Sequence, residues 1–314
     1  MEGLFNKSVF YGCLIKGDAR DAMQYLSRFP DQAAAYRKYE AVFEKEEYPV
    51  FKEDDALRDI LLIYQQYYRD AFYLRMDAAQ AEEAMKNRFL RLFHREHADL
   101  SMGELEETEI AEAFRKRSYH FLGGKTAGYW GPYIWKATEA KTYDVELPEG
   151  RHPYQVMLLD GFIAKSWLDF ISFGEVSTGG WTDGDGIIHC VKASYDLEDE
   201  AFTVSLLKHE AQHAMDLSRY PRLSSEDLEY RAKLVELIYS SGRNLLEQFI
   251  HEADDSKENN GHSLAAKRIT EGFAKRQRMD GGSRGALSIA DIQAIAKELF
   301  VSSSEDMKRK YAKD

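Results

Sequence analysis

The sequence predicts an α+β protein in which helices predominate and a small, mostly antiparallel sheet packs on one helix. Apolar residues recur at helical spacing through most of residues 8–120 and again beyond residue 200. Between about 140 and 191 the pattern changes to short runs separated by turns that contain Gly or Pro. We therefore expect a helical N-terminal lobe, residues 1–120, and a second lobe, residues 121–314.

The composition excludes several functional classes. The 314-residue chain is 44% hydrophobic and 31% charged, as in ordinary globular proteins. Its formal net charge of −12 argues against nucleic acid or an anionic membrane as the main partner. No apolar run approaches the roughly 18 residues of a membrane-spanning helix. Cys13 and Cys190 provide no disulfide framework and indicate a reducing cytoplasm.

The N-terminal lobe is expected to consist of packed amphipathic helices. The strongest patterns cover residues 56–75, 78–94 and 104–119. A Gly-rich stretch follows at residues 121–132 and is expected to join the two lobes.

The sheet is expected within about residues 140–191. Four strand signals lie there, at residues 142–147, 154–159, 167–173 and 187–191.

A helix that begins near Phe202 contains the sequence His-Glu-x-x-His. His209 and His213 lie four residues apart, so a helix presents both imidazoles on one face, as a tetrahedral zinc site requires. Glu210 is displaced around the helix from His209 and can reach a water at the metal without being a ligand. Its expected role is general base. Tyr220-Pro221 ends this helix, because Pro lacks the backbone donor.

Residues 206–215, Leu-Leu-Lys-His-Glu-Ala-Gln-His-Ala-Met, resemble the active-site helix of the zincin metallopeptidases. Uncharged positions flank both histidines, and a variable residue precedes the first. The segment after His213 lacks the Gly and the third His of metzincins. The resemblance is therefore to gluzincins, which take a Glu from the next helix as the third zinc ligand. It implies a strand at the cleft rim, for which we expect residues 187–191.

Glu229 is the expected third ligand. It lies on a helix that begins after Ser224, and small Ala232 would let the two helices approach closely. Glu226 and Glu236 on the same helix are the alternatives. Lys233 stands where the family has a second acid that orients a histidine, so that role is unassigned, with Asp216 a weak candidate.

The C-terminal helices are expected over residues 244–314. In gluzincins a His or Tyr from this side stabilises the oxyanion, and Tyr239, His251 and His262 are the candidates.

The resemblance implies a zinc metallopeptidase that binds one Zn²⁺ per chain and acts on a peptide or protein. The cysteines indicate a cytoplasmic location, and the net charge indicates no nucleic-acid or membrane partner. The oligomeric state is not indicated. The alternative is a catalytically inactive protein, either one with a structural zinc site or a helical scaffold whose motif is accidental.

Overall fold

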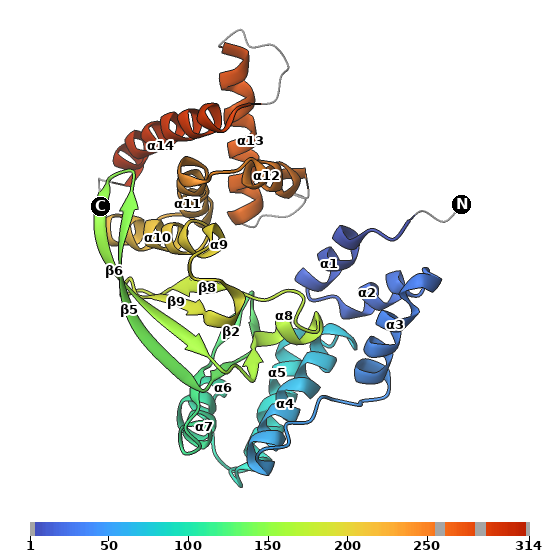
Figure 1. The fold of residues 1–314 in the computed structure, drawn as a ribbon. Helices are drawn as coiled ribbons and strands as arrows, with labels where there is room; N and C mark the ends of the chain where they lie inside the picture. Colours follow the sequence, from blue (N-terminus) through green and yellow to red (C-terminus); the bar gives the residue numbers. More distant parts are fainter. Residues whose placement is uncertain (1–3, 255–260, 280–286, 312–314) are drawn as a thin grey trace. The chain divides into compact units, whose positions relative to one another are not determined.

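The structure is a computed structural model that describes residues 4–254, 261–279 and 287–311. It confirms an α+β fold in which helices predominate (Figure 1). The chain divides into two compact units. Unit 1 comprises residues 1–137 and 160–178, and unit 2 comprises residues 138–159 and 179–314. Within the described residues, no helix is both long and apolar enough to cross a membrane.

Unit 1 is built from helices around an aromatic-rich core. The helices are α1 (Lys7–Ile15), α2 (Ala19–Leu26), α3 (Ala33–Tyr39), α4 (Asp55–Phe72), α5 (Ala78–Leu92), α6 (Met102–Leu105), α7 (Ala111–Arg115) and α8 (Ser166–Ile171). Short 3₁₀ or π segments cover Pro30–Gln32, Glu40–Glu44 and Glu106–Ile110. The expected helices at 56–75 and 78–94 correspond to α4 and α5, whereas 104–119 is divided by the π segment between α6 and α7.

The lobe boundary expected at residue 120 is not where the two units divide. The Gly-rich stretch forms strands instead of a plain connection: β1 (His120–Leu122), β2 (Lys125–Thr126), β3 (Tyr129–Trp130) and β4 (Tyr133–Trp135). β1 pairs with β4, which pairs with β7 (Ala164–Lys165). Ile134 and Ile171 are buried in the core of unit 1, which binds residues 121–137 and 160–178 to the N-terminal helices.

The strand expected at residues 167–173 is wrong, because this segment forms helix α8. Trp167 and Ile171 are both buried and lie four residues apart, so a helix directs both into the core. The run of apolar residues was too short to distinguish the two periods.

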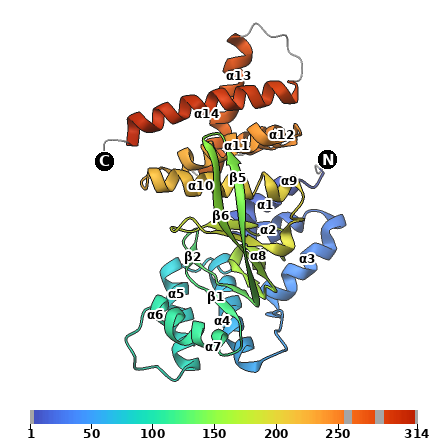
Figure 2. The same cartoon turned by 60° about the vertical axis from the view of Figure 1, so that its left-hand side comes forward.

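Unit 2 contains a four-stranded sheet in the order β5–β6–β9–β8. The strands are β5 (Ala137–Leu147), β6 (Gly150–Asp160), β8 (Gly180–Thr182) and β9 (Ile188–Val191). β5 and β6 form a long hairpin (Figure 2), since their two-residue connection can join only antiparallel strands. β9 is parallel to β6 and antiparallel to β8.

The other elements of unit 2 are helices. They are α9 (Glu200–Thr203), α10 (Leu207–Arg219), α11 (Ser225–Tyr239), α12 (Asn244–Asp254), α13 (Gly261–Met279) and α14 (Ile289–Tyr311), after a short 3₁₀ turn at Lys192–Ser194. α10 contacts β8 and β9 on one side and α11 on the other (Figure 1). The expected packing of the sheet on the motif helix is therefore present. The expected C-terminal helices are α12 to α14, with residues 255–260, 280–286 and 312–314 outside the description.

Candidate metal centre

The motif helix is shorter than the sequence indicates. The expected helix from Phe202 divides into α9 and α10, and α10 ends where Tyr220 donates its N–H to the carbonyl of Asp216, just before Pro221. His209 and His213 are nevertheless on one face of α10. Both are more than 90% buried, and their ring centroids lie 4.4 Å apart.

Glu229 on α11 faces both histidines. Its Oε2 lies 3.5 Å from Nε2 of His209, and its Oε1 lies 3.5 Å from Nε2 of His213. Ala232, one turn further along α11, is completely buried. Ligand atoms of the three residues all lie within 4.8 Å of one another. The structure therefore brings together the three predicted ligands, and this group could hold a metal ion.

The donor set fits a cation. His209, His213 and Glu229 offer two imidazole nitrogens and a carboxylate, the ligand types of a three-residue zinc site. Oε2 of Glu229 is a buried oxygen that accepts no hydrogen bond within the described chain, although Nδ1 of His262 lies 2.9 Å away. A buried carboxylate oxygen directed at imidazoles is an arrangement that a bound cation would stabilise.

The two alternative ligands have other positions. Glu226 lies near the surface, 3.7 Å from Nη1 of Arg268. Glu236 is buried behind His209, and its Oε1 lies 2.7 Å from Nδ1 of that imidazole. This contact leaves Nε2 of His209 directed toward Glu229. Glu236 is thus the carboxylate that orients a predicted ligand, a role the sequence left unassigned.

The position of Glu236 had a signal in the sequence. It lies seven residues after Glu229, which is about two helical turns. Both side chains therefore lie on the same face of the helix and face the same neighbouring helix. Asp216, the weak candidate for this role, instead accepts a hydrogen bond from Nε of Arg231 at 2.8 Å. Asp216 is fully buried, so this pair belongs to the interior of unit 2.

Two buried acids, Glu229 and Glu236, lie beside the imidazole of His209 and determine the electrostatics of the site. Burial alone would lower the pKa of His209, but the adjacent carboxylates of Glu229 and Glu236 raise that pKa to about 10. Burial would likewise raise the pKa of Glu229, yet the surrounding histidines hold it well below its usual range. The site thus stabilises positive charge between its carboxylates.

Glu210 is held by a contact that sequence reasoning did not find. Its Oε2 accepts a hydrogen bond from Oγ1 of Thr182 at 2.7 Å. Thr182 is the last residue of β8, which is the outer strand of the sheet beside α10. The strand expected at 187–191 is present as β9, but its expected position at the rim is wrong, because β9 is enclosed between β6 and β8.

The three candidates for oxyanion stabilisation differ in position. His262, at the start of α13, is next to Glu229 and 63% exposed. Tyr239 lies elsewhere on α11, where Nζ of Lys208 is 4.0 Å from its ring centroid. His251 is exposed on α12, and no contact within the described chain joins it to the three ligands.

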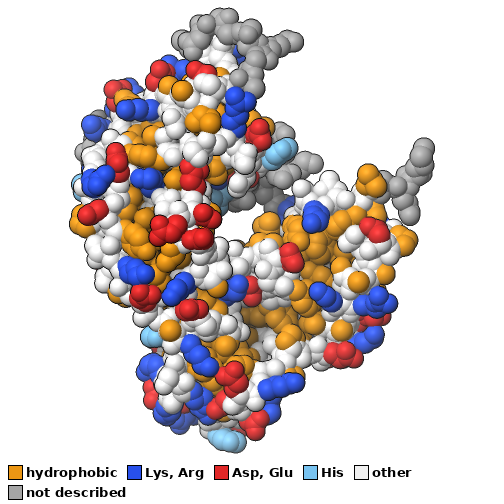
Figure 3. All heavy atoms as spheres, in the orientation of Figure 1, with side chains coloured by type: hydrophobic (Ala, Val, Ile, Leu, Met, Phe, Trp, Pro, Cys, Tyr) orange, Lys and Arg blue, Asp and Glu red, His pale blue; other side chains and the backbone are white. Residues whose placement is uncertain are grey.

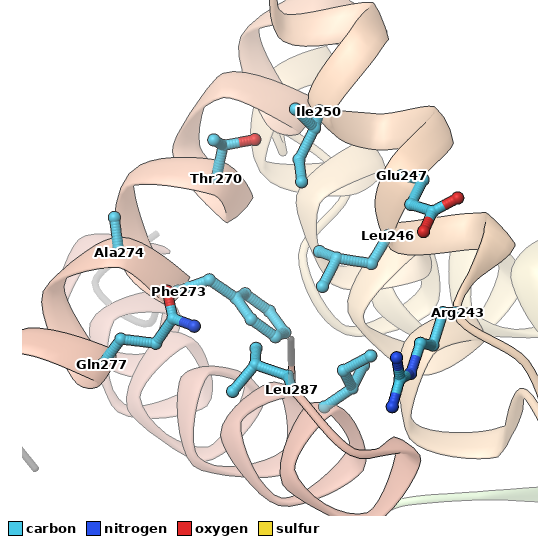
Figure 4. Close-up of a pocket in the computed structure, with 10 residues that line it drawn as sticks. Arg243, Leu246, Glu247, Ile250, Thr270, Phe273, Ala274, Gln277 and Leu287 are labelled. Atoms are coloured by element: carbon cyan, nitrogen blue, oxygen red, sulfur yellow. The ribbon is translucent and has the colours of Figure 1, made fainter. Parts of the chain in front are cut away.

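At least three pockets lie within the described part of unit 2, and two of them border α10 and α12, respectively. One, of about 520 Å³, is bounded by Ala214 and Ser218 of α10 together with residues 152–155 and 185–187. Ala214 and Ser218 follow Glu210 at intervals of four residues, so this pocket continues along the same helix face. The other, of about 300 Å³, lies between α12 and α13 and is lined mainly by apolar side chains such as Leu246 and Phe273 (Figure 4).

One face of the molecule carries side chains of both charges. On the face drawn in Figure 3, basic and acidic side chains are interspersed over both units.

Compared with protein-family models, curated proteins and solved structures, the chain matches none of them. The assignment of this centre therefore rests on its own residues.

Proposed function

We propose that the protein is a zinc-dependent hydrolase, most specifically a metallopeptidase of the gluzincin kind. The observation that carries the proposal is the convergence of His209, His213 and Glu229 from two helices, with Glu210 beside them on α10. His209 and His213 would hold the ion through Nε2, and Glu229 through its carboxylate. Bound Zn²⁺ supplies a water whose pKa is lowered to about 7 and polarises the substrate carbonyl.

The residues of this chain have separate roles in the proposed reaction. Glu210 accepts the proton of the attacking water and delivers it to the leaving amine. Glu236 keeps His209 in the orientation that directs Nε2 at the ion. His262, next to Glu229 and exposed, is the best placed of the three candidates to donate to the oxyanion. The substrate is a peptide or protein, and the cytoplasmic location expected from the cysteines stays a prediction.

A second candidate is a zinc protein without activity. Nδ1 of His262 lies 2.9 Å from Oε2 of Glu229, so His262 is near enough to the ligands to compete for the fourth position. A fourth protein ligand would close the site to water. In that case removal of His262 would lower zinc affinity, whereas in the hydrolase it would lower turnover and leave zinc bound.

Metal content and turnover together test the proposal. Mass spectrometry on protein purified without a metal-affinity tag should find about one zinc per wild-type chain. His213→Ala should lose it and Glu229→Gln should bind it more weakly, while Glu226→Gln, the surface control, should match wild type. Glu210→Gln should keep zinc and lose peptide hydrolysis by roughly 10²–10⁴-fold. A wild-type protein that takes up no zinc when supplied with it would rule the function out.

A further inference from the structure

The carboxylate of Glu210 is fixed at one oxygen. Oγ1 of Thr182 lies 2.7 Å from Oε2 of Glu210, the length of a hydrogen bond from a hydroxyl to an ionised carboxylate. A glutamate on a helix has three side-chain torsions, so a general base without such a contact would point at the reacting water only part of the time. With Oε2 engaged, Oε1 is the oxygen left to accept a proton.

We propose that Thr182 is a positioning residue that holds Glu210 in the orientation its general-base role requires. The inference rests on the proposed hydrolase function and deepens it. Thr182 touches neither the three ligands nor, in this role, the substrate. It acts through Glu210 alone.

Thr182 is itself held from both sides. On one side, Gly180 packs against Leu206 and the carbonyl oxygen of His189, where a Cβ would lie only 2.6 and 2.5 Å away. The contact with Leu206 involves the end of a flexible side chain, whereas the His189 carbonyl belongs to the backbone of β9. β8 can therefore lie this close to β9 only with glycine at this position. Pairing of Thr182 with Ile188 in β9 then sets the position of its side chain.

On the other side, Asp183 orders the loop that follows. Its Oδ1 accepts the backbone N–H groups of Asp185 and Ile187, each at 3.0 Å, and its Oδ2 lies 3.0 Å from Nε2 of His189. The His189 ring also stacks on Trp181 at 5.0 Å. Thr182 thus lies between two constrained neighbours, so its hydroxyl is presented to Glu210 from a rigid support.

A structural role for the same hydroxyl is the alternative. Oγ1 of Thr182 lies 3.0 Å from the backbone carbonyl oxygen of Glu210 and could fasten β8 to α10 through it. The hydroxyl has one hydrogen, and the shorter contact is to the charged acceptor, which gives the stronger bond. If the hydroxyl has only a structural role, a variant that keeps the fold should keep its turnover. If the hydroxyl positions Glu210, turnover should fall even though the fold is intact.

The experiment compares Thr182→Val, which removes the hydroxyl at nearly constant volume, with Thr182→Ser, which keeps it. The matched control is Thr203→Val, because Thr203 also lies in unit 2 and its hydroxyl bonds only a backbone carbonyl, that of Asp199 at 3.0 Å. Zinc per chain, kcat and KM are measured for each variant on a peptide that the wild type cleaves.

We expect Thr182→Val to keep zinc and KM and to lose roughly 10- to 100-fold in kcat, the size of one hydrogen bond to a charged group. Thr182→Ser should recover most of that loss, and Thr203→Val should match wild type. In a Glu210→Gln background, Thr182→Val should cause no further loss, because both changes act on one group.

Three results would overturn the positioning role. They are an unchanged kcat in Thr182→Val, a serine variant as impaired as the valine variant, or a full additional loss in the Glu210→Gln background. Failure of the function itself looks different, since the wild type would then lack zinc or turnover, and the role of Thr182 would fall with it.

Discussion

The two units bury different kinds of side chains. The core of unit 1 is dominated by aromatic residues, among them Tyr64, Phe72 and Trp167. Its buried polar residues are Asp70, Glu106, Ser166 and Ser172. The described interior of unit 2 holds more ionisable side chains, all of them on α10 and α11: His209, His213, Asp216, Asp227, Glu229, Arg231, Lys233 and Glu236. Burying a charged group is costly unless it is paired with an opposite charge. The ionisable side chains on α10 and α11 therefore occupy interior positions that apolar residues would otherwise fill.

Two buried acids show what the difference means. In unit 1, Glu106 accepts hydrogen bonds only from neutral groups, the Tyr64 hydroxyl at 2.5 Å and the Gly124 N–H at 2.6 Å. Burial outweighs these bonds and raises the pKa of Glu106 to about 7. In unit 2, Asp227 is surrounded by the cations of Arg268 and Lys310, which more than offset burial and lower its pKa. For these two acids, the charge of the hydrogen-bond partners decides the direction in which the pKa moves.

The largest effect should come from the paired interior of unit 2. Arg231→Ala would leave Asp216 buried without its cation and would also remove bonds to Ser304 and Glu149. We expect a loss of about 3–5 kcal/mol in the free energy of unfolding, measured by denaturant titration.

The control for this change is Arg219→Ala. Arg219 binds the same Glu149 at 2.8 Å but is 43% exposed, so its loss should cost less than about 1 kcal/mol. Similar losses in the two variants would show that burial does not distinguish these ion pairs.

Unit 1 should respond to pH through Glu106. Its folded-state pKa of about 7 exceeds the ordinary value of 4.5, so the folded state binds the proton more tightly. This contribution is complete below about pH 4.5 and is lost as pH rises through 7, a change of roughly 3 kcal/mol. Glu106→Gln mimics the protonated acid and should remove the dependence.

Unfolding by urea at several pH values between 5 and 8 would measure this slope. Three of the four tryptophans, Trp130, Trp135 and Trp167, belong to unit 1, so their fluorescence reports mainly on that unit. Glu107→Gln, a change at the exposed neighbour, should retain the wild-type slope. A slope that persists in Glu106→Gln would assign the titration to another group.

The sequence predicted what depends on local spacing. His209 and His213 share a helix face because of their four-residue interval, and Ala232 correctly indicated a close approach of α11 to α10. It could not predict contacts that depend on the tertiary fold. Thr182 reaches Glu210 only because β8 lies outside β9, a strand order that no local pattern encodes.

The same limit explains the two corrections to the fold. The segment 167–173 was too short for the spacing of its apolar residues to distinguish a strand from a helix. It forms a helix in which Trp167 and Ile171 are both buried in the core. The lobe boundary failed because residues 160–178 return to unit 1 after the β5–β6 hairpin. Such a return is invisible to a division that assumes contiguous domains.

A smaller effect is expected at Glu236, whose carboxylate contacts the candidate metal ligand His209. Glu236→Gln should weaken zinc binding by roughly 10- to 100-fold, because the neutral amide orients and polarises His209 less. Competition with a chelator of known affinity would measure the change. Glu226→Gln, at the exposed acid on the same helix, should bind zinc as wild type does. Equal weakening by both would indicate a general effect of negative charge on the ion.

The smallest effect should be at Asp227, which joins the start of α11 to the end of α14. Asp227 accepts hydrogen bonds from Lys310 at 2.7 Å and Tyr311 at 2.8 Å, and from Arg268 on α13. Since its folded-state pKa is lowered, its contribution is present above the ordinary value of 3.8 and is lost as pH falls below it. Asp227→Asn should cost about 1–2 kcal/mol at neutral pH, because Lys310 is largely exposed to water.

Acid titration of stability would show whether Asp227 and Glu106 oppose each other as their partners imply. As pH rises toward about 4, wild type should gain stability relative to Asp227→Asn, whereas between pH 4.5 and 7 wild type should lose stability relative to Glu106→Gln. The two variants would then separate the units by the sign of their pH dependence. If wild type changed in the same direction relative to both variants, the contrast between the neutral partners of Glu106 and the cationic partners of Asp227 would not govern the charge of these two acids.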